Sequence, residues 1–456
     1  MIYSFFYKNI QSINFIFYLS FAKIYANLHV EHLFYCEVGM GRYILHCDLN
    51  NFYASVECLF EPSIRNKAVV VVGDEEKRHG IVLAKNYVAK DYGIKTGDVV
   101  WEARQKCGEE LVCKGARFDV YLQVSKLVKD IYREYSDRVE SFGIDEAWVD
   151  ISHIATNYDE AVKIANEIRT RVINEVGLTI SIGVSFNKVF AKLGSDLKKP
   201  NATVIISDND YKEKIWPLPV SELLYVGRAT KAKFERANIR TIGDLACTDI
   251  QYLKLTLGKV GEELWRFANG LDKSEVTSIS DSEKIKSFGN STTCPIDLTS
   301  NEQVMSVIYM LAENVAERMR IKNYYGTTVS VWVKDTRLIS FERQATLAHV
   351  TNICEDIGKL AYELFLSNYD WAYDVRAVGV RISGLSNGNV QYDMFSSVQN
   401  LDKYHKLEIA LENLRKRFGY NIIRRGNIML NEKLSTLSPK SEIHITHPVG
   451  FFKGKK

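Results

Sequence analysis

The sequence has no cysteine pair at CxxC spacing, no strong net charge and no apolar run long enough to cross a bilayer. Its eight cysteines are scattered, which argues against a zinc site and a disulfide framework and fits a reducing cytoplasm. The net charge of +3 does not by itself indicate a nucleic-acid-binding protein. The apolar stretch at residues 13–22 spans about ten residues, which is too short for a transmembrane helix. We therefore expect no membrane role.

A chain of 456 residues is too long for one compact domain and predicts about three or four. Residues 1–39 differ from the rest, because they are crowded with Phe, Tyr and Ile and carry few charges. The next methionine after Met1 is Met40. Our hypothesis is that translation starts at Met40 and that residues 1–39 are a leader or a mis-assigned start.

Two adjacent carboxylates, Asp145 and Glu146, lie inside the otherwise largely apolar stretch 141–150. The apolar positions around them predict two short strands, with the carboxylates at the tight reversal between them: Phe142, Ile144, Ala147 and Val149. Asp and Glu are poor strand formers and are costly to bury without a partner. The pattern predicts either an exposed charged turn or a carboxylate pair that binds a divalent cation.

A second acidic segment lies upstream. Residues 43–47 are short, apolar and partly β-branched, which predicts a buried strand, and Asp48 follows directly. Asn50 and Asn51 then supply a helix start, and apolar residues recur at helical spacing as far as Phe60. Asp48 is therefore expected at the carboxyl end of a strand, beside the N-terminus of a helix.

If this strand pairs with the acidic hairpin, Asp48, Asp145 and Glu146 converge. Three carboxylates suit two Mg²⁺ ions, which take their remaining ligands from water and substrate phosphates. Two such ions roughly 3.5–4 Å apart can hold the attacking and leaving oxygens of a phosphoryl transfer. The two segments together predict a two-metal site for this chemistry.

Both acidic segments resemble the metal-binding motifs of the Y-family (translesion) DNA polymerases. The resemblance continues in the family's order from about Met40 to about Phe395. It implies that Asp48, Asp145 and Glu146 are the catalytic metal ligands and that the Leu49 carbonyl is a further ligand. It also implies primer-template DNA and deoxynucleoside triphosphates as substrates.

The resemblance assigns the nucleotide contacts as well. Phe52 and Tyr53 would lie at the incoming nucleotide, with Tyr53 as a steric gate that excludes a ribose 2′-hydroxyl. Tyr87 and Lys90 match a tyrosine and a basic residue of the fingers that contact the triphosphate. The family more often has arginine at the latter position, and lysine lacks the bidentate fork of arginine. Lys199, before a proline in a basic helix, would reach the triphosphate. Without the resemblance, Tyr53 can be read as a core aromatic and Lys90 as a solvated charge.

Residues 223–245 resemble the family's helix–hairpin–helix thumb, in which a glycine-bearing turn directs backbone amides at a phosphate. The expected DNA contacts are Gly227, Arg228, Thr230 and Lys231. Such contacts hold DNA without reading its sequence. The family commonly has glycine-hydrophobic-glycine in this turn, whereas this chain has Gly-Arg-Ala. The alternative is a plain helical hairpin.

Beyond residue 285 the pattern predicts a strand, a helix, two strands, a second helix and a last strand. This ββαββ-like module resembles the family's little finger. Basic side chains that could line its DNA-binding face, or that are simply solvated, are Lys286, Arg320, Lys322, Lys334, Arg337, Arg343, Arg376 and Arg381.

The pentapeptide 391–395 resembles the peptide with which bacterial polymerases bind the sliding clamp, with Gln391, Met394 and Phe395 as the contacts. Methionine replaces the commoner leucine at position 394. The chain after it is basic and predicts one helix around residues 407–418. This tail either contacts nucleic acid or only aids solubility.

We therefore predict a monomeric, cytoplasmic α+β multidomain protein with a ferredoxin-like palm. Its expected parts are a leader or mis-assigned start (1–39), a palm (40–65 and 116–215), fingers (66–115), a thumb (216–280), a little finger (285–388) and a clamp-binding peptide with a basic tail (389–456).

The predicted function is template-directed DNA synthesis by two-metal phosphoryl transfer, with error-prone lesion bypass and no proofreading. A palm-fold nucleotidyl cyclase is one alternative, because its acidic residues are arranged similarly. A non-catalytic, clamp-docked DNA-binding scaffold is the other. The intact acidic triad disfavours the scaffold, and the basic thumb and little finger disfavour the cyclase.

Overall fold

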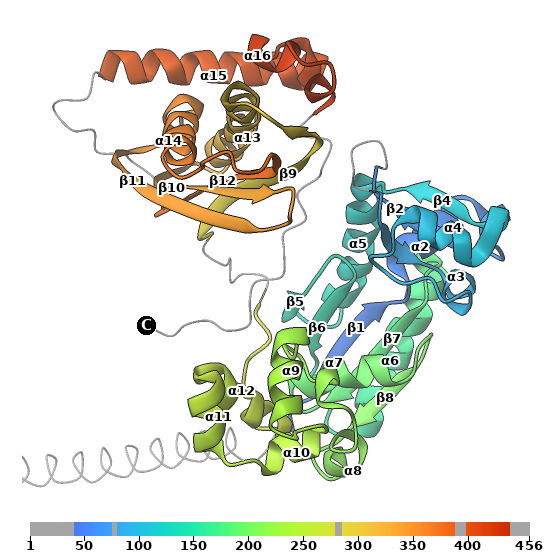
Figure 1. Cartoon of the computed structure of the whole chain (residues 1–456). Helices are drawn as coiled ribbons and strands as arrows, with labels where there is room; N and C mark the ends of the chain where they lie inside the picture. Colours follow the sequence, from blue (N-terminus) through green and yellow to red (C-terminus); the bar gives the residue numbers. More distant parts are fainter. Residues whose placement is uncertain (1–40, 75–79, 279–284, 388–397, 438–456) are drawn as a thin grey trace, which may run out of the picture. The chain divides into compact units, whose positions relative to one another are not determined.

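The computed structural model describes residues 41–74, 80–278, 285–387 and 398–437, and the chain folds into two compact units (Figure 1). The first unit contains residues 41–50 and 125–278, and the second contains the described parts of 51–124 and 285–437. Within these ranges no helix is long and apolar enough to span a membrane.

The first unit is built on a five-stranded sheet with the strand order β5-β6-β1-β7-β8. Its strands are β1 (Ile44–Leu49), β5 (Val139–Ser141), β6 (Glu146–Asp150), β7 (Ile180–Ser185) and β8 (Thr203–Ile206). All neighbours pair antiparallel except β7 and β8, which are parallel. The central strand β1 is buried at every position, as its unbroken run of mostly apolar residues requires.

Three helices belong with this sheet: α5 (Phe118–Arg133, of which residues from 125 lie in this unit), α6 (Tyr158–Arg171) and α7 (Lys188–Leu197). Helix α7 packs against β1, β7 and β8. Its approach is close because two glycines face each other. A Cβ at Gly183 would lie 1.9 Å from the Ala191 carbonyl oxygen, and one at Gly194 would lie 3.1 Å from the Gly183 Cα. Side chains of α7 therefore reach the strand that carries Asp48.

The acidic hairpin differs from its sequence prediction in one respect. Phe142 and Ile144 lie in the turn between β5 and β6 and not in strands, and Glu146 is the first residue of β6. The reason is backbone pairing, since the amides of Phe142 and Gly143 both donate to the Glu146 carbonyl, at 3.1 and 3.3 Å. Asp145 alone of the two carboxylates stands in the turn.

The same unit continues into a helical region made of α8 (Tyr211–Ile215), α9 (Arg228–Arg236), α10 (Ile242–Cys247), α11 (Ile250–Leu257) and α12 (Lys259–Ala268). Phe190 of α7 shares an apolar core with Phe234 and Leu264 of these helices. Gly258 joins α11 to α12 at φ 65°, and a Cβ at Gly261 would lie 2.3 Å from the Leu253 carbonyl oxygen. Both glycines are thus required for the tight pairing of α11 and α12.

The second unit holds a three-stranded sheet in the order β3-β2-β4, made of β2 (Val69–Val72), β3 (Val82–Lys85) and β4 (Val112–Gly115). Its helices are α2 (Phe52–Phe60), α3 (Tyr87–Asp91) and α4 (Val100–Cys107). Helix α2 begins where the sequence predicted. However, Asn51 adopts a left-handed conformation with φ 49°, and its side chain makes no capping hydrogen bond. Asn51 therefore starts the helix by its backbone conformation and not as a side-chain cap.

The second unit also holds a four-stranded antiparallel sheet in the order β11-β10-β12-β9. Its elements follow one another as β9 (Ser287–Leu298), α13 (Asn301–Ile321), β10 (Tyr324–Asp335), β11 (Ser340–Thr351), α14 (Cys354–Leu366) and β12 (Val375–Ser383), and the short β13 (Ser386–Asn387) pairs with β10. Helices α13 and α14 pack together and against the sheet. The strand and helix pattern expected after residue 285 is present.

The chain after residue 398 is folded onto this domain, with helix α15 (Val398–Phe418) lying over α13 and α14 (Figure 1), followed by the short α16 (Gly426–Met429). Ile428, Leu434 and Leu437 join the apolar core of the domain. Helix α15 is longer than the residues 407–418 predicted from the sequence. The tail is therefore a structural layer and not only a basic extension.

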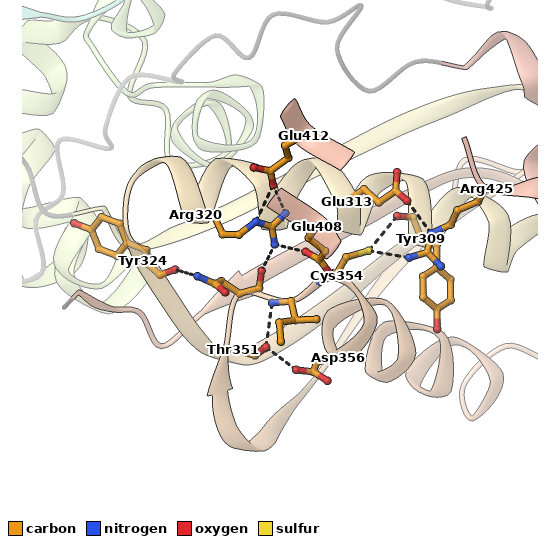
Figure 2. Close-up of polar contacts among 12 residues, drawn as sticks. Tyr309, Glu313, Arg320, Tyr324, Thr351, Cys354, Asp356, Glu408, Glu412 and Arg425 are labelled. Atoms are coloured by element: carbon orange, nitrogen blue, oxygen red, sulfur yellow. Dashed lines mark hydrogen bonds and ion pairs between the residues drawn. The ribbon is translucent and has the colours of Figure 1, made fainter. Parts of the chain in front are cut away.

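A buried cluster of charges joins α15 to the domain (Figure 2). The Arg320 guanidinium, near the end of α13, donates to Glu408, to Glu412 and to the Asn352 carbonyl. Glu408 also accepts from the Cys354 amide at 2.8 Å and so caps the first turn of α14. The expectation that Arg320 could face DNA is wrong, because two buried carboxylates hold its side chain.

Replacing Arg320 with methionine should destabilise the protein by about 3–5 kcal/mol, because two largely buried carboxylates lose the guanidinium that pairs with them. Urea unfolding of the intact protein measures the change. Arg381→Met is the matched control, since Arg381 pairs with Glu342 at the surface of the same domain; its cost should be about 0–1 kcal/mol. Equal effects of the two substitutions would contradict a structural role for the buried cluster.

Candidate functional site

The structure brings the three predicted carboxylates to one end of the first unit's sheet. Asp48 lies directly opposite Glu146 in the register of β1 and β6. The Leu49 amide donates to the Asp145 carbonyl at 3.1 Å, which ties the end of β1 to the acidic turn. Residues that are almost 100 positions apart in the sequence thus stand side by side because two short strands pair.

Helix α5 fixes the acidic turn from its other side. The Lys129 ammonium donates to the Gly143 carbonyl at 2.7 Å, and the Ser125 hydroxyl donates to the Ile144 carbonyl. Burial lowers the pKa of Lys129 to about 8, against the opposing effect of Asp145. Two donors one helical turn apart thus hold the backbone that carries Asp145. Sequence reasoning did not identify either of them.

Two lysine ammonium groups form ion pairs with the carboxylates. Lys199 is 2.6 Å from Asp48 and 2.8 Å from Asp196, and Lys192 of α7 is 2.6 Å from Glu146. Burial raises the pKa of Asp48 to about 7 despite Lys199. Burial also raises the pKa of Asp145, and the neighbouring Glu146 carboxylate adds to the effect. The site concentrates negative charge that cations must neutralise.

Glu146 behaves differently from its two neighbours. Burial opposes its ionisation, but His46 and Lys192 outweigh burial and lower its pKa to about 2. His46 of β1 is fully buried, and its Nε2 lies 3.4 Å from Glu146 Oε2. Burial lowers the pKa of His46 to about 4, so its ring is neutral at neutral pH. Glu146 is thus the carboxylate held most firmly in its charged form.

These side chains suit a hard divalent cation. Carboxylate oxygens are the ligands that Mg²⁺ prefers, and here they already attract two ammonium groups. Within the described ranges, no three His, Cys, Asp or Glu side chains lie at the spacing that holds a metal ion, and Asp48 and Glu146 each pair with a lysine. A divalent cation would take the positions of the ammonium groups, so the donor set fits the predicted metal.

Tyr53 of α2, the predicted steric gate, rests on an aromatic platform. Its ring stacks on Tyr121 with a centroid distance of 4.5 Å and an interplanar angle of 14°, and it meets the edge of Phe118 at 5.8 Å. Tyr121 donates to Glu57 at 2.6 Å, and Arg117 holds the same carboxylate through two bonds. Phe52 lies beside Tyr53 at 5.6 Å and is buried. The platform was not predicted, because it depends on packing between distant helices.

Tyr87 and Lys90 lie on one face of α3, with the Lys90 ammonium 5.8 Å from the centre of the Tyr87 ring. Lys90 is exposed. Asn86 anchors the helix, since its side chain caps the Ala89 amide at 2.9 Å, accepts from the Val69 amide and donates to the Lys67 carbonyl. The two predicted triphosphate contacts therefore sit on a short helix that is rigidly attached to its sheet.

Gly227 forms the N-cap of α9, and no side chain caps this helix. Arg228, Thr230 and Lys231 follow in its first turns. The Lys231 ammonium lies 3.9 Å from the Glu235 carboxylate, which is a long ion pair and not a hydrogen bond. An uncapped helix N-terminus flanked by cations is the arrangement expected of a phosphate contact. The predicted clamp-binding residues Gln391, Met394 and Phe395 lie outside the described residues.

Comparison with known proteins places these features in context. Residues 47–196 match the impB/mucB/samB family, residues 222–272 match the thumb domain of DNA polymerase iota, and residues 285–394 match the C-terminal domain of the impB/mucB/samB family. The chain is 50% identical over 400 residues to DNA polymerase IV of Acetivibrio thermocellus, covering 87% of this chain and 100% of the relative. It is 35% identical over 402 residues to DNA polymerase IV of Clostridium acetobutylicum, covering 86% and 100%.

A solved structure has the same fold. The Y-family DNA polymerase chimera Dbh-Dpo4(243-245)-Dbh superposes with a TM-score of 0.68 at 20% sequence identity. The match covers 76% of this chain and 100% of the chimera. At this identity the likeness supports the fold alone.

Proposed function

The chain belongs to the Y-family DNA polymerases, as a translesion DNA polymerase IV of α+β multidomain fold, and we propose that Asp48, Asp145 and Glu146 form its catalytic centre. The observation that carries this proposal is the register of β1 against β6, which sets Asp48 across from Glu146. The family uses divalent metals, and we propose two Mg²⁺ ions per active site. The Leu49 carbonyl would be a further ligand.

When bound, such ions would neutralise the triphosphate and lower the pKa of the primer 3′-hydroxyl. The chain's own residues prepare the site for them. Asp48 and Glu146 provide oxygen ligands from paired strands, and Asp145 provides another from a turn held by Ser125 and Lys129. Lys192 pairs with Glu146 and Lys199 pairs with Asp48, so the two ammonium groups balance the charge of these carboxylates.

The incoming deoxynucleotide would be held by Lys199, Tyr87 and Lys90 at its triphosphate. The Lys199 ammonium lies 2.6 Å from Asp48, so it is already beside the proposed site and would bind a phosphate placed there. Phe52 and Tyr53 would lie at the sugar, where the stacked ring of Tyr53 would collide with a ribose 2′-hydroxyl. The platform of Tyr121 and Phe118 supports this role by restricting movement of the Tyr53 ring.

Duplex DNA would be held by backbone contacts. Gly227, Arg228, Thr230 and Lys231 present helix amides and positive charge to a phosphate. Strand alternation puts Thr328, Ser330, Trp332 and Lys334 of β10 on the face of the four-stranded sheet opposite the buried valines, and Arg381, Gly379 and Ser291 of the neighbouring strands lie beside them. Such contacts depend on charge, so we expect affinity for DNA to fall steeply as salt rises.

Primer extension with each deoxynucleotide in the presence of Mg²⁺ tests the proposal. Addition should follow the template base and should continue past a damaged base. Synthesis without a template would favour a cyclase-like reaction, and DNA binding without extension would favour a scaffold. We further propose that the protein acts as a monomer in the cytoplasm.

We also propose that residues 391–395 bind the sliding clamp as an extended peptide. Replacing both Gln391 and Phe395 with alanine should weaken clamp binding at least tenfold, which corresponds to about 1.4 kcal/mol. Surface plasmon resonance with immobilised bacterial sliding clamp measures this. Primer extension without the clamp serves as the control and should not change. Equal clamp affinity in the double variant would rule the peptide out.

A further inference from the structure

His46 is a buried polar side chain beside the proposed catalytic carboxylates, and the proposed reaction does not use it. It lies on β1, two residues before Asp48, and its ring is fully buried. It pairs in register with Trp148 of β6, whose ring meets it edge-on at 5.2 Å. A buried imidazole must find partners for both ring nitrogens or lose free energy. The positions of those partners indicate what the residue does.

One nitrogen has a firm partner. His46 Nδ1 lies 2.8 Å from the Ser195 hydroxyl of α7. Ser195 reaches it because α7 packs so closely at the Gly183 and Gly194 contact, where a Cβ at Gly183 would also lie 2.5 Å from the Ser195 amide nitrogen. The Ser195 hydroxyl lies 2.7 Å from the Lys192 carbonyl as well, so its single hydrogen can serve either neighbour.

The other nitrogen points at the catalytic site. Within the described part of the chain, His46 Nε2 has no hydrogen bond of ordinary geometry, and Glu146 Oε2 lies 3.4 Å from it. A neutral imidazole carries one proton. If that proton is on Nε2, it is directed at Glu146, and Nδ1 accepts from the Ser195 hydroxyl. In this arrangement Nδ1 has a hydrogen-bond donor and the Nε2 proton faces the carboxylate, whereas a bare Nε2 would repel the carboxylate.

We propose that His46 is a positioning residue, which orients the Glu146 carboxylate for cation binding, with Ser195 setting the ring tautomer that makes this possible. The inference rests on the proposed role of Glu146 as a metal ligand. Lys192 approaches the same oxygen, Glu146 Oε2, at 2.6 Å. His46 would keep its position if this ammonium moved away, because its ring is fixed by burial on β1 and by α7.

The test is the affinity of the full-length protein for Mn²⁺, measured by electron paramagnetic resonance of the free ion. The sample contains primer-template DNA with a dideoxy-terminated primer and the matching deoxynucleotide. His46→Phe keeps the ring and removes both nitrogens, and it should weaken Mn²⁺ binding roughly 10-fold to 100-fold. His46→Gln places an amide donor near Nε2 and should restore most of the affinity. Ser195→Ala should weaken binding in the same direction as His46→Phe.

Ser185→Ala is the matched control, because it removes a different buried serine hydroxyl from the same sheet, one that donates to the Ile206 carbonyl. It should leave Mn²⁺ affinity unchanged. The proposal is overturned if His46→Phe binds Mn²⁺ like the wild type, or if His46→Gln is no better than His46→Phe. Should His46→Phe fail to fold, wild-type affinity in Ser195→Ala overturns it instead.

Glu146→Gln in the same titration separates this inference from the proposed function. Loss of Mn²⁺ binding in Glu146→Gln together with normal binding in His46→Phe rejects only the role of His46. Unchanged Mn²⁺ binding in Glu146→Gln rejects Glu146 as a ligand, and the positioning role of His46 is then rejected with it.

Discussion

Asp145→Asn should lower the rate of primer extension by at least about 1,000-fold, which corresponds to roughly 4 kcal/mol of transition-state stabilisation. The amide keeps the size of the side chain but cannot share the charge of a divalent cation. Single-turnover extension of a labelled primer in Mg²⁺ measures the effect. Affinity for primer-template DNA should be retained, since we propose that the thumb and the little finger supply those contacts.

A second measurement separates lost chemistry from lost structure. Burial raises the pKa of Asp145, and the neighbouring Glu146 carboxylate adds to the rise, so its charged form is unfavourable in the folded protein without metal. Asp145→Asn should therefore raise the thermal midpoint in the presence of a chelator. A variant that is more stable and yet inactive would identify Asp145 as a residue kept for chemistry.

Asp130→Asn is the matched control, because Asp130 is an exposed carboxylate of α5 that pairs only at the surface with Arg133. Its extension rate should stay within a few-fold of the wild type. Normal extension by Asp145→Asn would refute the proposed catalytic centre. A DNA affinity that falls in parallel with the rate would point to a binding role in its place.

The three carboxylates that we propose as catalytic could be picked out from the sequence because each belongs to a strong local pattern. Asp48 ends a buried strand, and Asp145 with Glu146 interrupts another apolar stretch. Pairing of the two strands then needs only a register that sets Asp48 across from Glu146. The prediction failed at finer detail, in placing Glu146 in the turn, because that boundary depends on amides of residues 142 and 143 donating to one carbonyl.

The residues around the carboxylates could not be predicted in this way. Lys129 and His46 matter because of where α5 and α7 pack, and that packing depends on long-range contacts such as the one between Gly183 and Gly194. Periodicity assigned these residues to a helix or a strand but gave no information on their partners. The signal in the sequence was a histidine two positions before Asp48, and its partner Ser195 lies far away along the chain.

The segment after residue 396 shows that charge composition, like periodicity, does not predict which residues pair in the fold. Counting residues after position 396 predicts a basic segment, which is correct as composition. The structure turns the acidic side chains of α15, Glu408 and Glu412, inward onto Arg320. Charge composition cannot reveal which side chains face the rest of the fold, so the sequence predicted a basic tail with one helix, either contacting nucleic acid or aiding solubility, and not a layer of the domain.

The other large effect is expected at Tyr53. Tyr53→Ala should raise kcat/KM for ribonucleoside triphosphates by roughly 100-fold, since removing a clash worth about 2.7 kcal/mol admits the 2′-hydroxyl. Use of deoxynucleotides should fall much less, because the ring excludes an atom that they lack. Steady-state incorporation opposite one template base, with the ribo- and deoxy-forms compared, measures the ratio.

The aromatic platform sharpens this test, because a gate must be rigid in order to discriminate. Tyr121→Leu removes the ring on which Tyr53 stacks at 4.5 Å and should give a smaller gain in ribonucleotide use, in the same direction as Tyr53→Ala. Tyr92→Ala, an exposed tyrosine of the same unit, is the matched control and should leave selectivity unchanged. If Tyr53→Ala kept wild-type selectivity, Tyr53 would be a packing residue only. If Tyr121→Leu alone kept it, the gate would act without its platform, and the selectivity would reside in the ring of Tyr53 itself.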